Sequence, residues 1–254
     1  MARVKFVTGM PIAVVTTKSG KKIISIADVH LGVEIELKAK GFNVPLRTKH
    51  LANKLIDVML RFQPDILLIL GDLKHQIKGL NKEVLREVKL FTNLLRKSMS
   101  HVKIIVVRGN HDGALRSFDD VKVYPSSGIL IDDVGFIHGN AKPNPSTLTG
   151  EVLLMGHVHP ALPSKLGGQR IWVIYHLSRK MRGRLAKRFK VEVNVKRVII
   201  QPAYNDYLGG VFEADSLRRL CPLFRGLLDP LKGYVYGLDG TFIGRFSSLS
   251  SGSS

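Results

Sequence analysis

The sequence predicts an α/β fold in which a largely parallel β-sheet is covered by helices. Between residues 22 and 107, short β-branched and apolar runs alternate with longer segments whose apolar residues recur at helical spacing. This alternation is typical of strand–helix–strand units. Hydrophobic residues make up 44% of the 254-residue chain, which is enough for one substantial core. Several apolar runs end on Asp, Asn or His, where parallel sheets usually carry their functional groups.

The first half of the chain predicts alternating strands and helices. The expected strands are 4–7, 12–16, 22–27, 66–70 and 103–107. One helix is expected over 46–62, ending at Gln63-Pro64, and another begins after Asn81, a favourable N-cap residue. The segment 31–44 contains two glycines and is expected to be a loop with at most one helical turn. Right-handed crossovers between the strands would make this part of the sheet parallel.

The second half has weaker periodicity and predicts mostly strands. The expected strands are 129–131, 134–137, 152–155, 171–175 and 191–200, followed by a terminal hairpin of 234–236 and 241–246. Apolar residues at every fourth position predict a short helix over 179–190. The last residues, 247–254, are almost all Ser and Gly and are expected to form a flexible tail. Residues 1–246 would then form a single domain.

Candidate metal ligands and a candidate acid–base residue follow five of the predicted strands. They are Asp28 and His30, Asp72, Asn110 and His111, His138, and His157 and His159. Singly, Asp28 could cap a helix, Asn110 could form a turn, and Asp72 could be a solvated loop acid. Two histidines around one valine, His157 and His159, have fewer packing reasons to occur. As a set, the residues favour a metal site over separate structural roles.

These residue types suit a pair of divalent cations bound to a phosphoester. Phosphate oxygens repel anionic nucleophiles, whereas two cations roughly 3.5–4 Å apart clamp the phosphate and acidify a bound water. A carboxylate must bridge the two ions, and Asp72, after a central strand, is the expected bridge. The other ligands are expected to form two sets: Asp28, His30 and His159 around one ion, and Asn110, His138 and His157 around the other.

The spacing of the ligands and the residue after Asn110 support this interpretation. In an extended segment, residues i and i+2 point to the same side, so Asp28 with His30, and the histidines of 157–159, can converge. His111, held by Asp112, is expected beside the ions as a general acid or as a charge stabiliser for the leaving oxygen. Nitrogen and oxygen ligands without cysteine suit manganese, iron, zinc or cobalt.

Taken in order, these motifs resemble the full motif set of the calcineurin-like metallophosphoesterase superfamily. The motifs are Asp28-x-His30, Gly71-Asp72, Gly109-Asn110-His111-Asp112, His138 and Gly156-His157-x-His159. More narrowly, the segments 27–32, 41–45 and 156–160 resemble the DNA ligase-associated metallophosphoesterase group and its archaeal relatives. The resemblance implies two packed mixed β-sheets flanked by helices, with a dinuclear site at the carboxyl edge of the sheets. A separate capping domain is not evident.

His75, three residues after Asp72, adds a resemblance to the nuclease branch of the superfamily. In that branch the corresponding histidine contacts the scissile phosphate. The resemblance therefore implies that Asp72, His75 and His111 surround the phosphate. The alternative is that His75 is an ordinary loop histidine.

The charge of the chain favours a polyanionic partner. Lys and Arg number 39 against 20 Asp and Glu, which gives a formal net charge of +19. Within a basic segment at 165–200, seven residues are expected to hold backbone phosphates: Arg179, Lys180, Arg182, Arg184, Lys187, Arg188 and Lys190. The alternative is that this stretch is simply a solvated helix face.

The cellular setting follows from what the sequence lacks. The single cysteine, Cys221, excludes an internal disulfide and a thiolate metal site, which fits a reducing compartment. No apolar run approaches the roughly 18 residues of a membrane span. The first residues lack a signal-peptide pattern. We therefore expect a cytoplasmic protein without membrane contact.

The leading hypothesis is a metal-dependent phosphodiesterase or nuclease that acts on DNA or RNA. A hydroxide bridging two ions, most readily manganese, would attack phosphorus, and the resemblance implies association with DNA repair proteins. A small-nucleotide phosphodiesterase or phosphatase is the alternative, because it would use the same residues. A binding or scaffold protein with a decayed site would lack ligands or His111, and the sequence has lost neither.

Overall fold

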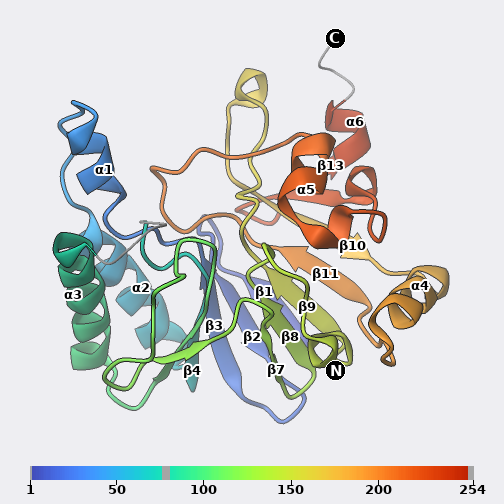
Figure 1. Ribbon diagram of the computed structural model, residues 1–254, viewed down its shortest axis with the longest axis horizontal. Coiled ribbons are helices and arrows are strands. Elements are labelled where there is room, and N and C mark those ends of the chain that lie inside the picture. Colours follow the sequence, from blue (N-terminus) through green and yellow to red (C-terminus); the bar gives the residue numbers. More distant parts are fainter. Residues whose placement is uncertain (1, 76–80, 251–254) are drawn as a thin grey trace.

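The protein forms four layers, as a computed structural model of residues 2–75 and 81–250 shows (Figure 1). Two β-sheets pack face to face in the middle. The outer layers are α2 (Thr48–Phe62) and α3 (Lys82–Ser98) on one side, and α4 (Arg179–Phe189), α5 (Ala214–Leu220) and α6 (Phe246–Ser250) on the other. The expected α/β fold of two packed mixed sheets flanked by helices is therefore confirmed.

The first sheet has six strands in the order β1-β2-β3-β4-β5-β6. They are β1 (Arg3–Phe6), β2 (Ala13–Thr16), β3 (Lys22–Ala27), β4 (Ile66–Leu70), β5 (Lys103–Val107) and β6 (Lys122–Tyr124). The pairs β1–β2 and β2–β3 are antiparallel, whereas β3 to β6 run parallel. Helices α1 (Val33–Ala39) and α2 connect β3 to β4, and α3 connects β4 to β5. The five strands expected here are present, and β6 is an additional short one.

The second sheet has seven strands in the order β13-β12-β10-β11-β9-β8-β7. They are β7 (Ile129–Ile131), β8 (Val134–Ile137), β9 (Val152–Met155), β10 (Ile171–His176), β11 (Arg197–Ile200), β12 (Tyr234–Gly237) and β13 (Phe242–Arg245). Strands β8, β9 and β11 run parallel, and the other pairs are antiparallel. Both expected hairpins, β7–β8 and β12–β13, are confirmed.

Side chains of the central strands alternate between two apolar cores. Ile24 and Ile26 of β3 pack toward α2 and α3, whereas Ile23 and Ala27 pack between the two sheets. Strand β4 alternates in the same way. Strands buried on both faces have continuous apolar sequences, which is why these strands are visible in the sequence.

The two long helices begin and end where the sequence predicts. Asn81 is the N-cap of α3, and its side-chain oxygen accepts a hydrogen bond of 2.8 Å from the amide of Glu83. Helix α2 ends at Phe62, and its C-cap, Gln63, has a left-handed conformation before Pro64. Among the helices of the described residues, none combines the length and the apolar character needed to cross a bilayer.

The segment 31–44 differs from its prediction because α1, a helix of 7 residues, occupies half of it. Gly32 and Gly41 suggested a loop, but they lie at the two ends of α1, with φ of 88° and 90°. Left-handed glycines are common at helix boundaries. The same residues that disfavour a helix interior therefore mark the limits of α1.

The alternating valines of 191–195 do not form a strand, and β11 begins only at Arg197. The amides of Asn194 and Lys196 donate to carbonyl groups just before β9 and not to a regular ladder. Two of the three valines are buried. The alternation therefore reflects burial of an irregular segment.

The first part of the predicted Ser/Gly tail is ordered. Ser247 to Ser250 belong to α6, whose first residue, Phe246, is fully buried in the core outside the second sheet. Leu249 packs against the same core. Two apolar anchors therefore order the start of the serine-rich stretch, and 251–254 lie outside the described residues.

A buried glutamine connects the two sheets close to the edge where their parallel strands end. Gln201 directly follows β11, and its Nε2 donates to the carbonyl oxygens of Ser25 in β3 and of Pro11, at 2.7 and 3.0 Å. Its Oε1 accepts from the Ser25 hydroxyl at 2.9 Å. These bonds fix β11 against β3 in an otherwise apolar interface.

Replacing this glutamine should destabilise the protein without changing its fold. Gln201→Leu keeps the volume but leaves buried groups without partners, so the free energy of unfolding should fall by about 1–3 kcal/mol. Urea denaturation followed by circular dichroism would measure it. Gln169→Leu, at an exposed position, should change stability by less than about 0.5 kcal/mol. Equal stability of Gln201→Leu and the native protein would contradict the connecting role.

Candidate dinuclear metal centre

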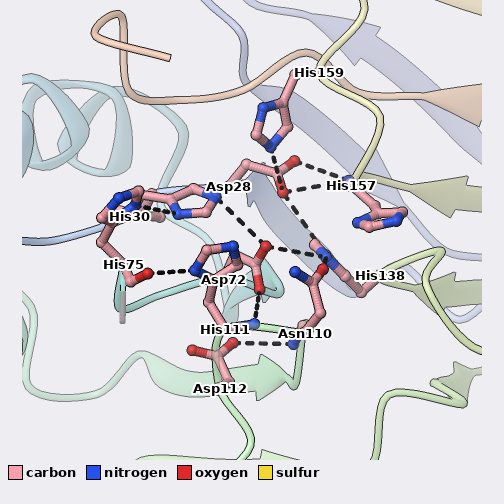
Figure 2. Close-up of polar contacts among 12 residues, drawn as sticks. Asp28, His30, Asp72, His75, Asn110, His111, Asp112, His138, His157 and His159 are labelled. Atoms are coloured by element: carbon pink, nitrogen blue, oxygen red, sulfur yellow. Dashed lines mark hydrogen bonds and ion pairs between the residues drawn. The ribbon is translucent and has the colours of Figure 1, made fainter. Parts of the chain in front are cut away.

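The predicted ligands converge where strands of both sheets end (Figure 2). The loops after β3, β4 and β5 supply those from the first sheet, and the loops after β8 and β9 supply those from the second. The residues brought together are Asp28, His30, Asp72, Asn110, His138, His157 and His159. The structure therefore gathers all seven at one place.

Their donor atoms form two clusters, and the carboxylate of Asp72 lies between them. One contains Asp28, His30 and His159, and the other contains Asp72, His138 and His157, with the donor atoms of each within 4.8 Å of one another. Oδ2 of Asp72 lies 3.4 Å from Nε2 of His30 and 3.4 Å from Nε2 of His138. Asp72 thus faces both clusters, which is the position that a bridging carboxylate requires.

Asn110 lies beside the second cluster. Its Oδ1 is 3.3 Å from Nε2 of His138. The expected division of ligands into two sets therefore agrees with the positions of the side chains.

Buried nitrogens without partners indicate that this arrangement fits cations. Nε2 of His30 and Nε2 of His159 are buried, and neither has a hydrogen-bond partner among the described residues. They nevertheless lie 3.4 Å and 3.1 Å from carboxylate oxygens of Asp72 and Asp28. Nitrogen and oxygen donors that approach without hydrogen-bond geometry are suited to a shared metal ion. The donor set fits the two cations that the motifs predict.

Two of the imidazoles are oriented by main-chain carbonyl groups. Nδ1 of His138 donates to the carbonyl of Leu70 at 2.7 Å, so Nε2 faces Asp72 and Asn110. Nε2 of His157 contacts the carbonyl of Leu220, the last residue of α5, at 3.2 Å. Such contacts fix ring orientation and tautomer in metal sites. Leu220 was not predicted, because a main-chain carbonyl leaves no signal in the sequence.

Electrostatics couple the carboxylates to the imidazoles. Burial raises the pKa of Asp72, but the hydrogen bond with His138 and the charges of His138 and His30 outweigh it, so the pKa lies well below its ordinary value. Burial lowers the pKa of His138, yet the hydrogen bond and charge of Asp72 raise it to about 9. A cation entering here must displace the His138 proton, which makes metal binding pH-dependent.

The ligand loops have a strained backbone and are not extended as predicted. The residues with left-handed φ are Asp28 (56°), His30 (45°), Asp72 (50°), His157 (74°) and His159 (41°). Non-glycine residues rarely adopt this region, and such strain concentrates at functional sites. The paired residues therefore reach the centre through tight turns and not through alternation along a strand.

The glycines of the motifs leave room for the ligands. A Cβ added to Gly109 would lie 2.0 Å from Oδ1 of Asp72, and one added to Gly71 would lie 2.2 Å from Nδ1 of His138. Only glycine fits at these two approaches. The glycines in the Gly71-Asp72 and Gly109-Asn110 motifs therefore have a steric reason.

Asp112 does not hold the ring of His111, contrary to expectation. Its buried carboxylate accepts hydrogen bonds from the amides of Leu73 at 3.2 Å, Lys74 at 3.2 Å and Gly109 at 3.0 Å. These bonds join the loops after β4 and β5. Asp112 therefore positions the loops that carry Asp72 and Asn110.

His111 and His75 lie next to the first cluster, on one side of His30. The His111 amide donates to Oδ1 of Asp72 at 2.7 Å, and its Nδ1 contacts the carbonyl oxygen of His75. The ring of His75 packs on that of His111, with centroids 5.4 Å apart. Both nitrogens of His75 contact protein groups, Nδ1 with His30 and Nε2 with Glu36. His111 therefore lies beside the candidate ligands His30 and Asp72.

The basic helix lies away from the centre. Strand β11 runs parallel to β9 and finishes at the centre as β9 does, whereas β10 is antiparallel and its last residue, His176, pairs with Arg197, the first of β11. Helix α4 follows β10 and therefore begins at the opposite edge of the sheet (Figure 1). The structure does not bring to the centre the residues expected to hold phosphates there: Arg179, Lys180, Arg182, Arg184, Lys187, Arg188 and Lys190.

Filling the space at Gly109 should disrupt the centre while preserving the fold. In Gly109→Ala, the new methyl group displaces the Asp72 carboxylate, so metal affinity should fall roughly 10–100-fold. Calorimetric titration with Mn²⁺ would measure the loss, and circular dichroism would check the fold. Gly113→Ala is the matched control, because its Cβ would meet no atom within 4 Å. Native-like affinity in Gly109→Ala would argue against Asp72 as a ligand.

The sequence and the fold were compared with those of known proteins. Residues 21–199 match the family model described as calcineurin-like phosphoesterase. A search of curated protein sequences gave no significant match. The Pseudomonas putida nuclease MPE has a similar fold, with a TM-score of 0.54, 18% identity, and coverage of 93% of this chain and 98% of its own. The Escherichia coli phosphoesterase YfcE has a TM-score of 0.35 and 17% identity over 88% of this chain and 97% of its own. Because the family model matches residues 21–199 of the 254-residue sequence, the chain belongs to the calcineurin-like phosphoesterase family.

Proposed function

We propose that this phosphoesterase is a dinuclear-metal-dependent phosphodiesterase that hydrolyses nucleic acid. The family assigns phosphoester hydrolysis. The convergence of ligands on Asp72 supports two metal ions. Manganese as the native metal, a cytoplasmic location and association with DNA repair proteins belong to the same proposal.

The observation that favours nucleic acid is the position of α5. The carbonyl of its last residue touches His157, and Arg218 and Arg219 directly precede that residue. Both arginines are exposed, and Arg225 donates to their carbonyl oxygens at the end of the helix. These three arginines belong to the chain segment that contacts His157, and the side chain of Arg218 is also paired with Asp215 and Asp229. A polyanion that extends beyond the reacting phosphate could reach this segment. We propose that the arginines hold backbone phosphates in place of the basic helix α4.

The residues of the centre divide the chemistry between them. When bound, a pair of divalent cations supplies an acidified water and clamps the phosphate. Asp72 lies between the two sets of ligands and would bind the cations of both. The Nδ1 contact of His111 with a carbonyl leaves Nε2 as the nitrogen that exchanges a proton with the leaving oxygen.

A small-nucleotide phosphodiesterase or phosphatase remains the alternative, because it would use the same centre. It has no need for the arginines at and after the end of α5. The nuclease name of the Pseudomonas putida protein, which shares the fold, also favours the polymeric substrate. A decayed site is disfavoured, since the whole ligand set converges.

Hydrolysis assays should show a metal-dependent nuclease that needs His111. With Mn²⁺, the protein should cleave single-stranded DNA or RNA, and His111→Ala should lower kcat by about 10²–10⁴-fold because the proton donor is lost. Its metal content should stay unchanged. The exposed His101→Ala serves as a control that keeps full activity. Turnover of cyclic nucleotides with inert nucleic acid would support the alternative.

The two exposed arginines of α5 should control the salt dependence of binding. In chelator, Arg218→Gln/Arg219→Gln should bind single-stranded DNA more weakly, with a log–log salt slope reduced by about 1.4, since each phosphate contact contributes about 0.7. Fluorescence anisotropy at several salt concentrations would measure it. Lys187→Gln/Arg188→Gln removes equal charge from exposed positions of α4 and should keep the native slope. The reverse result would assign phosphate binding to α4.

A further inference from the structure

A carboxylate outside the predicted ligand set is connected to the metal centre. Oε2 of Glu36, on α1, lies 2.9 Å from Nε2 of His75. The other ring nitrogen of His75, Nδ1, lies 3.0 Å from Nδ1 of His30. Nε2 of His30 faces the centre, 3.4 Å from Oδ2 of Asp72. A continuous series of polar contacts thus runs from α1 to a candidate ligand.

Main-chain bonds explain why Glu36 and His75 meet. The amide of His75 donates to the carbonyl of Leu31 at 3.0 Å, and the amide of Leu31 donates to that of Leu73 at 2.9 Å. Leu31 lies two residues before α1, so these bonds hold the His75 loop against the start of the helix. Lys40, one turn beyond Glu36, contacts the other carboxylate oxygen. Both ends of the Glu36–His75 contact are therefore held in place.

The donors and acceptors along this series fix the position of each proton. A carboxylate only accepts, so Nε2 of His75 must donate to Glu36. Nδ1 of the neutral His75 ring then carries a lone pair and accepts from Nδ1–H of His30. The remaining nitrogen of His30, Nε2, is left unprotonated and faces the centre. This is the tautomer that a metal ion requires.

We propose that Glu36 is a positioning residue for the metal ion held by Asp28, His30 and His159. It sets the tautomer and orientation of His75, which in turn set those of His30. The inference rests on the metal role of His30 in the proposed function. It also gives His75 a role through His30 that does not depend on contact with the substrate.

The expected effect is on metal affinity and not on stability. The side chain of Glu36 is 49% exposed, and exposed ion pairs contribute little to folding. Hydrogen-bond partners of metal-binding histidines, by contrast, alter metal affinity by about 10–100-fold. Loss of the carboxylate should therefore weaken one ion while the fold is unchanged.

Titration of chelator-treated protein with Co²⁺, followed by visible absorption and calorimetry, tests the proposal. Glu36→Ala should weaken one of two ions about 10–100-fold and leave the other as in the native protein. Glu36→Gln should retain most of the affinity, because its amide oxygen still accepts from Nε2–H of His75. Lys38→Ala, an exposed change on the same helix, is the matched control and should bind both ions normally.

The variants separate this inference from the proposed function. If the native protein binds two ions and His30→Ala loses one, but Glu36→Ala binds both normally, the positioning role is wrong. Equal losses in Glu36→Gln and Glu36→Ala would also overturn it. If the native protein binds no ions, or His30→Ala keeps both, the metal role of His30 is wrong and this inference fails with it.

A spectroscopic measurement tests the proton positions directly. Long-range ¹H–¹⁵N spectra of the metal-free protein should show the proton of His75 on Nε2 and that of His30 on Nδ1. In Glu36→Ala, His75 should lose its single tautomer, whereas Glu36→Gln should restore it. A proton on Nε2 of His30 in the native protein would overturn the proposal.

Discussion

Two buried carboxylates govern the arrangement of the sheet edge. The residue exposures of Asp28 and Asp72 are 0% and 2%, and a buried charge without partners is strongly destabilising. Main-chain amides supply part of the compensation: His157 donates to Asp28 at 3.0 Å, and His111 donates to Asp72 at 2.7 Å. Imidazoles, and cations when bound, supply the rest. The left-handed turns after β3, β4 and β9 let the chain surround the carboxylates so closely.

The features that could be predicted from the sequence are those that depend on short, contiguous segments. Strands such as β3 and β4 are buried on both faces, so they appear as unbroken apolar runs, and their ends are marked by Asp28 and Asp72. The parallel order then places those ends together, which is why the ligand set and its division could be predicted. The turns themselves could not, because Asp28 and His30 adopt conformations that their residue types do not favour.

The features that the sequence concealed depend on tertiary contacts. Glu36 and His75 meet because residues 73–75 lie against Leu31, just before α1. The six basic residues of α4 and its C-cap, Lys190, suggested a phosphate site, but strand direction places α4 at the far edge. The composition of a helix gives its charge, whereas the topology of the fold determines where on the surface that charge lies.

The contact between Leu220 and His157 has a mechanical consequence. Because the oxygen belongs to the main chain, replacing the Leu220 side chain leaves the acceptor in place, whereas any displacement of α5 carries it away from the ring. Leu220 also lies beyond residue 199, where the family match ends. The orientation of a candidate ligand is thus coupled to the placement of α5, a peripheral helix that carries none of the motif residues.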